Sequence, residues 1–497
     1  MTVSHWIDGT QVPSDGATQP ILDPSTGQQI GEVALATAEV VDDAVIRAKG
    51  AQKAWGHASL AKRMEVMYAF RQLLVENTDA LARIISREHG KTVADAAGEI
   101  ARGRESVEFA CNIASELKGD FSANVSTGVD VHSVRQPLGV VVGITPFNFP
   151  AMVPMWMHPI AIATGNAFIL KPSERDPSAA NFVADLYKRA GLPDGVFQVV
   201  HGGKEAVDAL LTHPLVSAVS FVGSTPIAQY VQQTAIRAGK RVQALGGANN
   251  HAVVMPDADM PFAASQIAAG AFGSAGERCM AVPVAVAVGG AGDALIAELT
   301  KEATSIVVGP GDKASTTMGP VITAASKQRV VDFIDEAVAG GAEAVVDGRG
   351  LVVAGHEEGF FVGPTLLRGV QPTMRAYCDE VFGPLLVVME VDTLQDAIEL
   401  INSGPYGNGT AIFTASGEAA RVFTEEIEVG MIGVNVPIPV PVGYYSFGGW
   451  KNSLFGDHHA HGPEAVRFYT RAKAITTRWP HQAQRDVSAS LNFPGHT

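Results

Sequence analysis

The stretch GVVVGITPFNFP, Gly139–Pro150, decides the fold that this sequence predicts. A run of β-branched residues ends in a short loop with proline and asparagine, and another apolar segment follows. The same order of strand, loop and helix continues to about residue 246, through the strand candidates AFILK, VFQVV, VSAVSFVG and RVQALGG and the helix candidate SAANFVADLYKRAG. Such alternation is typical of a mostly parallel sheet with helices on both faces.

A second α/β series begins near His251. Its strand candidates are HAVVM, PVAVAV, PLLVVMEV and TAIFTA, and its helix candidates are MPFAASQIAAGAFGSAGERC and KQRVVDFIDEAVAGGAE. Two doubly wound sheets in tandem predict a cleft between them, and open sheets of this kind bind ligands beyond the carboxyl ends of their strands.

Three outer segments complete the predicted fold. Apolar residues recur at helical spacing from Thr37 to about Leu117, and VDVHSVRQPLG alternates like one arm of an extended hairpin. AVRFYTRAKAITTRW predicts a last strand, of the kind that often pairs with another subunit. We therefore expect an α/β chain of two doubly wound parallel-sheet domains and a small β oligomerisation arm. The predicted parts are a first domain of residues 1–120 and 138–246, a second of 247–449, arm strands at 121–137 and 463–480, and a C-terminal tail, 481–497.

Composition excludes several classes of partner. The 497 residues carry a formal net charge of -15 and no basic run, so we expect neither nucleic-acid binding nor attraction to anionic membranes. The opening MTVSHWIDGTQVPSDG lacks the features of a signal peptide, and no apolar run is long enough to span a bilayer, which predicts a cytoplasmic protein. The three cysteines have no CxxC spacing and no histidine partner at ligand spacing, so neither a disulfide framework nor a metal site is expected.

Cys279 differs from the other two cysteines in its surroundings. It follows Arg278 within FGSAGERCMAV, Phe272–Val282, among small and turn-forming residues. Small neighbours would let ligands approach its sulfur closely, and the adjacent arginine offers positive potential that would favour a thiolate. Cys111 and Cys378 are interpreted as small buried apolar residues.

Three predicted strand ends carry donors for a phosphate-bearing cofactor, although the GxGxxG fingerprint is absent after the first strand. They are TPFNFP (Thr145–Pro150), LKPSER (Leu170–Arg175) and FVGST (Phe221–Thr225). Ser224 falls where a helix should begin, and free N–H groups there could meet a pyrophosphate oxygen. Lys171 and Glu174 could hydrogen-bond the two hydroxyls of a ribose.

The motifs PFNFP, LKPSER, FVGST, GERCMA and EVFGPL, in this order across nearly the whole chain, resemble the aldehyde dehydrogenase superfamily. That resemblance implies an NAD-dependent enzyme in which Cys279 is the nucleophile. It implies that Asn148 and the backbone N–H of Cys279 stabilise the oxyanion, a role for which one donor contributes about 3 to 4 kcal/mol. The implied cofactor site comprises Thr145, Phe147, Lys171, Glu174, Arg175, Ser224, Gly246 and Glu380, with Glu380 at the nicotinamide ribose.

A general base is missing from this pattern. Hydrolytic members of the superfamily carry a glutamate in a motif close to ELGGK, but this chain reads QALGGANN, with Ala244 or Leu245 at that position. Without a base, attack of water on a thioester should slow by about 10²- to 10⁴-fold. A thiol acceptor has no such difficulty, because about a few per cent of it is thiolate near neutral pH.

The segments QALGGANNHAVVMPDAD, GERCMA and NVPIPVPVGYYSFGGWKNSLFGD resemble the CoA-acylating branch, the methylmalonate-semialdehyde and malonate-semialdehyde dehydrogenases. This resemblance implies oxidative decarboxylation of such a semialdehyde, with NAD and CoA, to propionyl-CoA or acetyl-CoA. It also implies a homotetramer with contacts near 120–137 and 465–479. Asn249 stands where relatives usually have lysine.

A substrate with a carboxylate needs a cationic partner, and the planar fork of arginine suits it best. The resemblance points to Arg278, beside the nucleophile, and to Arg102 in EIARGRESVEFAC. Two alternatives remain at this stage. One is a hydrolytic semialdehyde dehydrogenase whose water is activated by Glu277 or by a histidine such as His251, and the other is a catalytically silent binding protein on the same fold.

Overall fold

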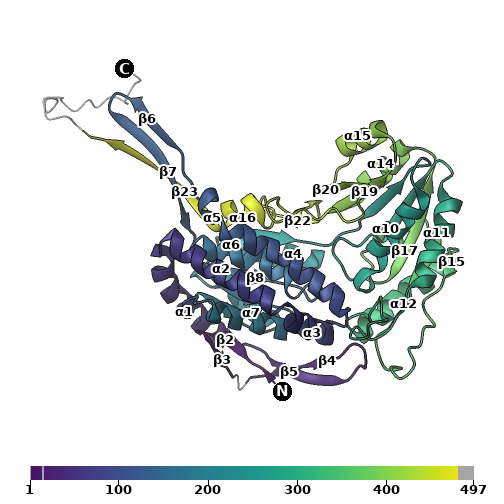
Figure 1. Ribbon diagram of the computed structural model, residues 1–497, viewed down its shortest axis with the longest axis horizontal. Helices are drawn as coiled ribbons and strands as arrows, with labels where there is room; N and C mark the ends of the chain where they lie inside the picture. The colour runs from purple at the N-terminus through teal and green to yellow at the C-terminus, as the bar shows by residue number, and fades with distance from the viewer. Residues whose placement is uncertain (1, 14–15, 480–497) are drawn as a thin grey trace.

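The computed structural model describes residues 2–13 and 16–479 (Figure 1). The predicted tail, 481–497, lies outside the described residues. Two large sheets form the body, and a β arm extends away from it. Among the described residues, no helix is both long and apolar enough to cross a bilayer.

The first large sheet has eight strands, in the order β22-β12-β11-β8-β9-β10-β2-β3. Its strands are β2 (His5–Ile7), β3 (Thr10–Val12), β8 (Val140–Ile144), β9 (Ala167–Lys171), β10 (Phe197–Val199), β11 (Val216–Val222), β12 (Arg241–Leu245) and β22 (Leu454–Phe455). The five from β8 to β12 are parallel, as predicted. The outer strands β2 and β22 run antiparallel to their neighbours, so this sheet also takes strands from near the beginning and the end of the chain.

Helices cover both faces of this sheet, and each face has its own apolar core. One core includes residues of α2 (Leu60–Glu76), α3 (Thr78–His89), α4 (Val93–Cys111), α5 (Ile113–Glu116), α6 (Met152–Ala163), α7 (Ser178–Arg189) and α16 (Gly462–Tyr469). The other includes residues of α1 (Ala38–His57), α8 (Lys204–Thr212) and α9 (Thr225–Arg237). The predicted helical block before residue 117 is thus confirmed as α1 to α5.

The second large sheet has seven strands, in the order β15-β16-β17-β14-β13-β19-β20. They are β13 (His251–Val254), β14 (Val284–Val288), β15 (Glu343–Val346), β16 (Thr365–Arg368), β17 (Leu385–Val391), β19 (Gly409–Phe413) and β20 (Met431–Val434). All pairs except β15 with β16 are parallel. Its helices are α10 (Met260–Phe272), α11 (Gly292–Ser305), α12 (Ala324–Ala339), α13 (Arg375–Cys378), α14 (Leu394–Asn402) and α15 (Gly417–Glu426).

Three small sheets complete the fold. They are β1 (Thr2–Val3) with β5 (Gln29–Ala34) and β4 (Thr18–Leu22), β18 (Tyr406–Gly407) with β21 (Trp450–Lys451), and the arm of β6 (Phe121–Ser126), β7 (Val129–Pro137) and β23 (Thr470–Arg478). In the arm, β7 is central and antiparallel to both neighbours, which confirms the predicted hairpin.

Two sequence-based boundaries are wrong. Residues 463–469, predicted as part of the last arm strand, belong to α16, whose apolar residues Ala465, Val466 and Phe468 are buried in the core. The helix candidate that ran to Cys279 ends at Phe272, because Ser274 and Ala275 both have φ near +50°. That left-handed backbone cannot continue a right-handed helix.

Candidate active site

The carboxyl ends of neighbouring parallel strands meet at one edge of the eight-stranded sheet. Ile144 of β8 pairs with Lys171 of β9 and with Phe221 of β11, and Val222 of β11 pairs with Leu245 of β12. The loops that begin at residues 145, 172, 223 and 246 therefore leave the sheet at the same edge. Every predicted cofactor residue except Glu380 lies in one of these loops or at a strand end beside them.

The segment 246–250 carries the chain directly from this edge to the amino end of β13. The N–H of Gly247 donates to Thr225 Oγ1 at 2.9 Å, and the N–H of Ala248 donates to Glu380 Oε1 at 3.0 Å. Asn249 Nδ2 donates to the carbonyl of Tyr377 at 2.6 Å. This short segment is thus held from both sides by residues far away in sequence.

The second sheet consequently contributes its amino edge to the site. Asn250 precedes β13, Cys279 precedes β14 and Glu380 precedes β17. The expectation that both sheets use the carboxyl ends of their strands is wrong for this one. With only five residues between β12 and β13, no helix can reverse the chain, so β13 starts beside the place where β12 ends.

The structure brings most of the predicted cofactor residues to this rim. Lys171 Nζ donates to Glu174 Oε2 at 3.0 Å, and the Arg175 guanidinium lies 5.2 Å from the Phe147 ring centroid. Thr145 is buried, and its Oγ1 has no hydrogen-bond partner among the described residues. Two further members are Ser224, the exposed N-cap of α9, and Gly246, where a Cβ would come within 2.5 Å of the Asn452 carbonyl oxygen.

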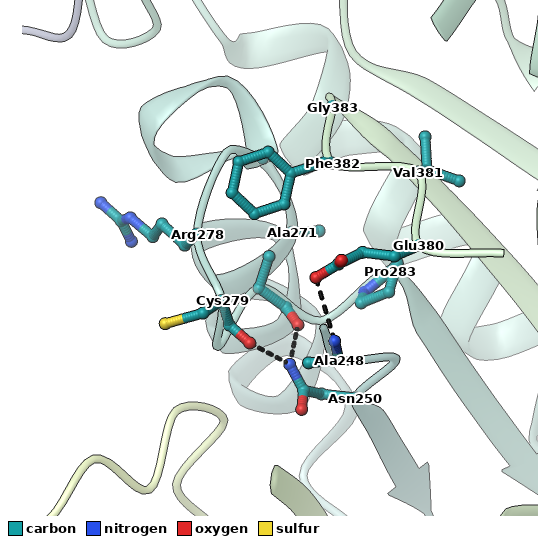
Figure 2. Close-up of a pocket in the computed structure, with 12 residues that line it drawn as sticks. Ala248, Asn250, Ala271, Arg278, Cys279, Pro283, Glu380, Val381, Phe382 and Gly383 are labelled. Atoms are coloured by element: carbon teal, nitrogen blue, oxygen red, sulfur yellow. Dashed lines mark hydrogen bonds between the residues drawn. The ribbon is translucent and has the colours of Figure 1, made fainter. Parts of the chain in front are cut away.

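Cys279 is half-buried, in a loop that two asparagines hold by its backbone. Asn250 Nδ2 donates to the Cys279 carbonyl at 3.0 Å and to the Ala281 carbonyl at 2.7 Å, and Asn408 Nδ2 donates to the Cys279 carbonyl at 3.1 Å. Figure 2 shows the sulfur pointing away from Asn250 and Glu380, toward the side on which Arg278 extends. The backbone is therefore anchored while the sulfur faces the cavity.

Burial and the nearby Glu380 carboxylate raise the pKa of the Cys279 thiol to about 12. Arg278 lowers this pKa, as expected, but burial and the Glu380 carboxylate outweigh its effect. Burial also raises the pKa of Glu380 to about 7. Both groups line one small cavity, which also contains Phe382 and Asn250 (Figure 2).

Asn148 lies in the loop after β8, where a buried ion pair holds its carbonyl and the backbone that follows it. Lys91 Nζ donates to the Asn148 carbonyl and to Glu99 Oε2, both at 2.6 Å. Glu99 Oε1 accepts from the N–H groups of Ala151 and Met152 at 2.9 and 3.2 Å. Both charged side chains are almost fully buried, so their desolvation costs free energy of folding. The hydrogen bonds that they make fix the position of this loop.

A cavity of about 430 Å³ opens on the other side of Cys279. Arg102 and Arg278 both line it, so the structure brings together the two predicted substrate-binding arginines and the predicted nucleophile. Asp95, Glu99 and Arg102 line it from α4, at spacings of four and three residues that place them on one helix face. The remaining lining residues are Gly98, Phe149, Met152, Trp156, Met280, Ile438 and Val440.

Neither predicted alternative base faces these cavities. Glu277 is fully buried, and both of its carboxylate oxygens accept from the N–H of Ile322, at 3.2 and 3.3 Å. His251 lies in β13 and its Nε2 faces Tyr377 Oη at 3.2 Å. Ala244 is fully buried in β12. Glu380 is the carboxylate that shares the smaller cavity with Cys279, and one of its oxygens is held by Ala248.

The model of the aldehyde dehydrogenase family matches residues 11–475. The chain belongs to the aldehyde dehydrogenase family. A malonate-semialdehyde dehydrogenase of Pseudomonas aeruginosa is 56% identical to it over 494 residues, which cover 99% of both chains. A Drosophila melanogaster protein described as a methylmalonate-semialdehyde/malonate-semialdehyde dehydrogenase of the acylating kind is 44% identical, over 99% of this chain and 95% of that one. A structure of a protein from Sinorhizobium meliloti 1021, described as a methylmalonate-semialdehyde dehydrogenase and solved with NAD, superposes with a TM-score of 0.96 at 49% identity, covering 97% of this chain and 98% of that one.

Several residues of this aldehyde dehydrogenase site escaped the sequence analysis. They are Lys91, Asp95, Glu99, Asn250, Asn408 and Trp156. Asp95 and Glu99 could have been found from their helical spacing to Arg102. Asn408 and Lys91 lie far from Cys279 and Asn148 in sequence and contact them only in the folded chain. A smaller error is Cys378, which was predicted to be buried and is exposed.

The raised pKa of Cys279 predicts slow alkylation of the enzyme without ligands. The thiolate fraction, and with it the rate with iodoacetamide, should rise about tenfold per pH unit between pH 7 and 9, because the pKa lies above this range. Mass spectrometry of peptides follows the modification, with the exposed Cys378 as internal reference. A rate at Cys279 that is high at pH 7 and independent of pH would contradict the raised pKa.

Lys91→Met should lower turnover with a simple aldehyde such as propanal by about 10- to 100-fold, because a shift of about 1 Å in a catalytic group can cost that much. The loss should be smaller in an Asn148→Ala background, since the lysine acts on that residue through its carbonyl. Steady-state kinetics of the four proteins measure this coupling. Lys301→Met, at an exposed pair with Glu298, is the matched control and should change little. Fully additive losses would show that Lys91 does not act through Asn148.

Proposed function

We propose that this chain catalyses NAD-dependent, CoA-acylating oxidative decarboxylation of malonate semialdehyde and methylmalonate semialdehyde. The products are acetyl-CoA or propionyl-CoA, CO₂ and NADH. The observation that carries the proposal is the cavity that Cys279 lines together with two arginines, while Ala244 or Leu245 stands at the position of the hydrolytic base. The substrates named for the Pseudomonas and Drosophila relatives support the same assignment.

The residues at the rim of the first sheet fit a dinucleotide. The unpartnered Oγ1 of Thr145 and the amino end of α9, where the Ser224 side chain makes no cap hydrogen bond, offer donors for a phosphate. Glu380 and the Lys171–Glu174 pair can bind ribose hydroxyls. When bound, NAD supplies the acceptor for the hydride. The related structure from Sinorhizobium meliloti holds NAD, which supports this reading.

The chain's own residues carry the covalent steps. Cys279 loses its proton and its sulfur forms a bond to the aldehyde carbon. The carbonyl electron pair moves to oxygen, and Asn148 with the Cys279 N–H stabilises the resulting alkoxide. The thiol proton passes to solvent, since the sulfur points away from Glu380 (Figure 2). Oxidation then leaves a thioester on Cys279.

Decarboxylation follows on the thioester. The bond between the carboxylate carbon and the α-carbon breaks, CO₂ leaves, and the electron pair passes to the thioester oxygen as an enolate. The same two donors stabilise this oxygen, and a proton from water completes the acyl group. The thiolate of CoA then forms a bond to the acyl carbon, and Cys279 leaves as a thiolate.

Hydrolysis to a free acid is the second candidate function. Glu277 and His251 are buried and hydrogen-bonded elsewhere, which argues against hydrolysis. Glu380 is the carboxylate in the smaller cavity that could still serve as a base for it. The dependence of sustained turnover on CoA separates the two candidates.

NADH formation from malonate semialdehyde should be limited to about one equivalent per subunit without CoA and should continue only with it, because neither Ala244 nor Leu245, at the position of the hydrolytic glutamate, can activate water on the thioester. Mass spectrometry should identify acetyl-CoA as the product, and Cys279→Ser should give no burst. Sustained turnover without CoA would instead establish hydrolysis. Malonyl-CoA as the main product would contradict decarboxylation.

The β arm supports a further part of the proposal, assembly into a homotetramer. Strands β6 and β23 form its outer edges, and Phe121 on β6 is 66% exposed. Unpaired edges and exposed aromatic side chains favour association with another chain.

Light scattering should give a mass of four chains for the wild type. Phe121→Glu should shift it toward smaller species, because the charge disfavours an apolar interface. A monomeric wild type would contradict the proposed assembly.

A further inference from the structure

The arginines of the cavity beside Cys279 are each bound to a carboxylate of the protein itself. Arg278 Nη2 donates to Asp95 Oδ1, and Arg102 Nη1 donates to Glu105 Oε1 at 2.6 Å. Arg102 also donates from Nη2 to the carbonyls of Val440 and Pro441, at 3.0 and 3.2 Å. A substrate carboxylate that enters therefore meets cations that already have partners.

The pair of Asp95 and Arg278 is built into the walls of the cavity. Asp95 lies in the first turn of α4, where its N–H donates to Thr92 Oγ1 at 3.1 Å. The Arg278 guanidinium lies against Gly273, at which a Cβ would approach Nη1 to 2.5 Å. The side chains of Asp95 and Arg278 are only 23% and 20% exposed. Both partners are thus held where the substrate must bind.

The Asp95 carboxylate has one oxygen that is not used by the ion pair. Its second oxygen, Oδ2, is buried and accepts no hydrogen bond from the described residues. Most of the other side chains that line the cavity are apolar, including Phe149, Trp156 and Ile438. In such surroundings a charge acts more strongly on its neighbours than it does in water. A second carboxylate near Arg278 is therefore repelled by Asp95.

We propose that Asp95 competes with the substrate carboxylate for Arg278, so that this carboxylate stays weakly bound until it leaves as CO₂. The inference rests on the proposed function. A cation that held the carboxylate firmly would stabilise the ground state more than the transition state, in which the charge moves onto the thioester oxygen. Competition from Asp95 reduces that ground-state stabilisation. After CO₂ has left, Arg278 keeps Asp95 as its partner, and no unpaired cation remains in the cavity.

Asp95→Asn removes the negative charge and keeps a side chain of the same shape. The KM for malonate semialdehyde should fall by about tenfold, because the substrate no longer competes with a charge-assisted hydrogen bond. The kcat for acetyl-CoA should fall, and the fraction of malonyl-CoA should rise, because CoA attacks the thioester before CO₂ is lost. The KM for propanal, which has no carboxylate, should stay within about twofold.

Three further variants make the comparison specific. Asp95→Glu retains the charge and should keep the product ratio of the wild type. Asp95→Ser removes the charge with a residue that suits a helix start, and it repeats the test should the asparagine variant fold poorly. Glu108→Gln is the control for loss of a carboxylate from α4 outside this cavity, since Glu108 pairs with Arg71 and Arg104.

The outcomes distinguish failure of the proposed role of Asp95 from failure of the proposed function. A higher KM for the semialdehyde, or an unchanged malonyl-CoA fraction in both charge-removing variants, overturns the role of Asp95. It would mean that Asp95 only orients Arg278. A wild-type enzyme that forms no acetyl-CoA in the same assay overturns the proposed function itself.

Discussion

The rest of the site depends on the five residues between β12 and β13. This segment is too short for a helix, so the amino edge of the second sheet lies against the carboxyl edge of the first. Loops from both sheets then reach one place: most of the predicted cofactor residues come from strand ends of the first, and Cys279 and Glu380 from strand beginnings of the second. The hydrogen bonds from Gly247 and Ala248 to Thr225 and Glu380 fasten this junction.

Buried and half-buried charged side chains fix the position of α4 relative to the loops of the site. Helix α4 supplies one face with Asp95, Glu99 and Arg102, and each of these binds a partner from another element. Because α4 packs on α6 at Gly103, where a Cβ would lie 3.0 Å from the Met152 Cα, this face is pressed against the loop that carries Asn148. The ion pairs are thus fixed by helix packing as well as by charge.

The family could be predicted from the sequence because it rests on short local motifs, and the same motifs single out Cys279 as the predicted nucleophile. The strand runs from Val140 to Leu245 alternate with helices, and GERCMA marks Cys279 among small residues. Local patterns were insufficient where tertiary contacts decide. The predicted helix continued past Phe272, yet Ser274 and Ala275 take left-handed backbone, and Gly276 fits a position where a Cβ would lie 2.1 Å from the Gly383 carbonyl oxygen.

The sequence by itself determined the α/β class, the succession of strands and helices along the chain, the small-residue setting of Cys279 and the lack of a carboxylate at Ala244 or Leu245, because each follows from residue type and spacing within a short stretch. Only the tertiary structure decided which edges face each other, that the cavity arginines carry Asp95 and Glu105, and that the Cys279 thiol has a raised pKa. Charge pairing and burial depend on groups that are far apart along the chain, and folding alone brings those groups together.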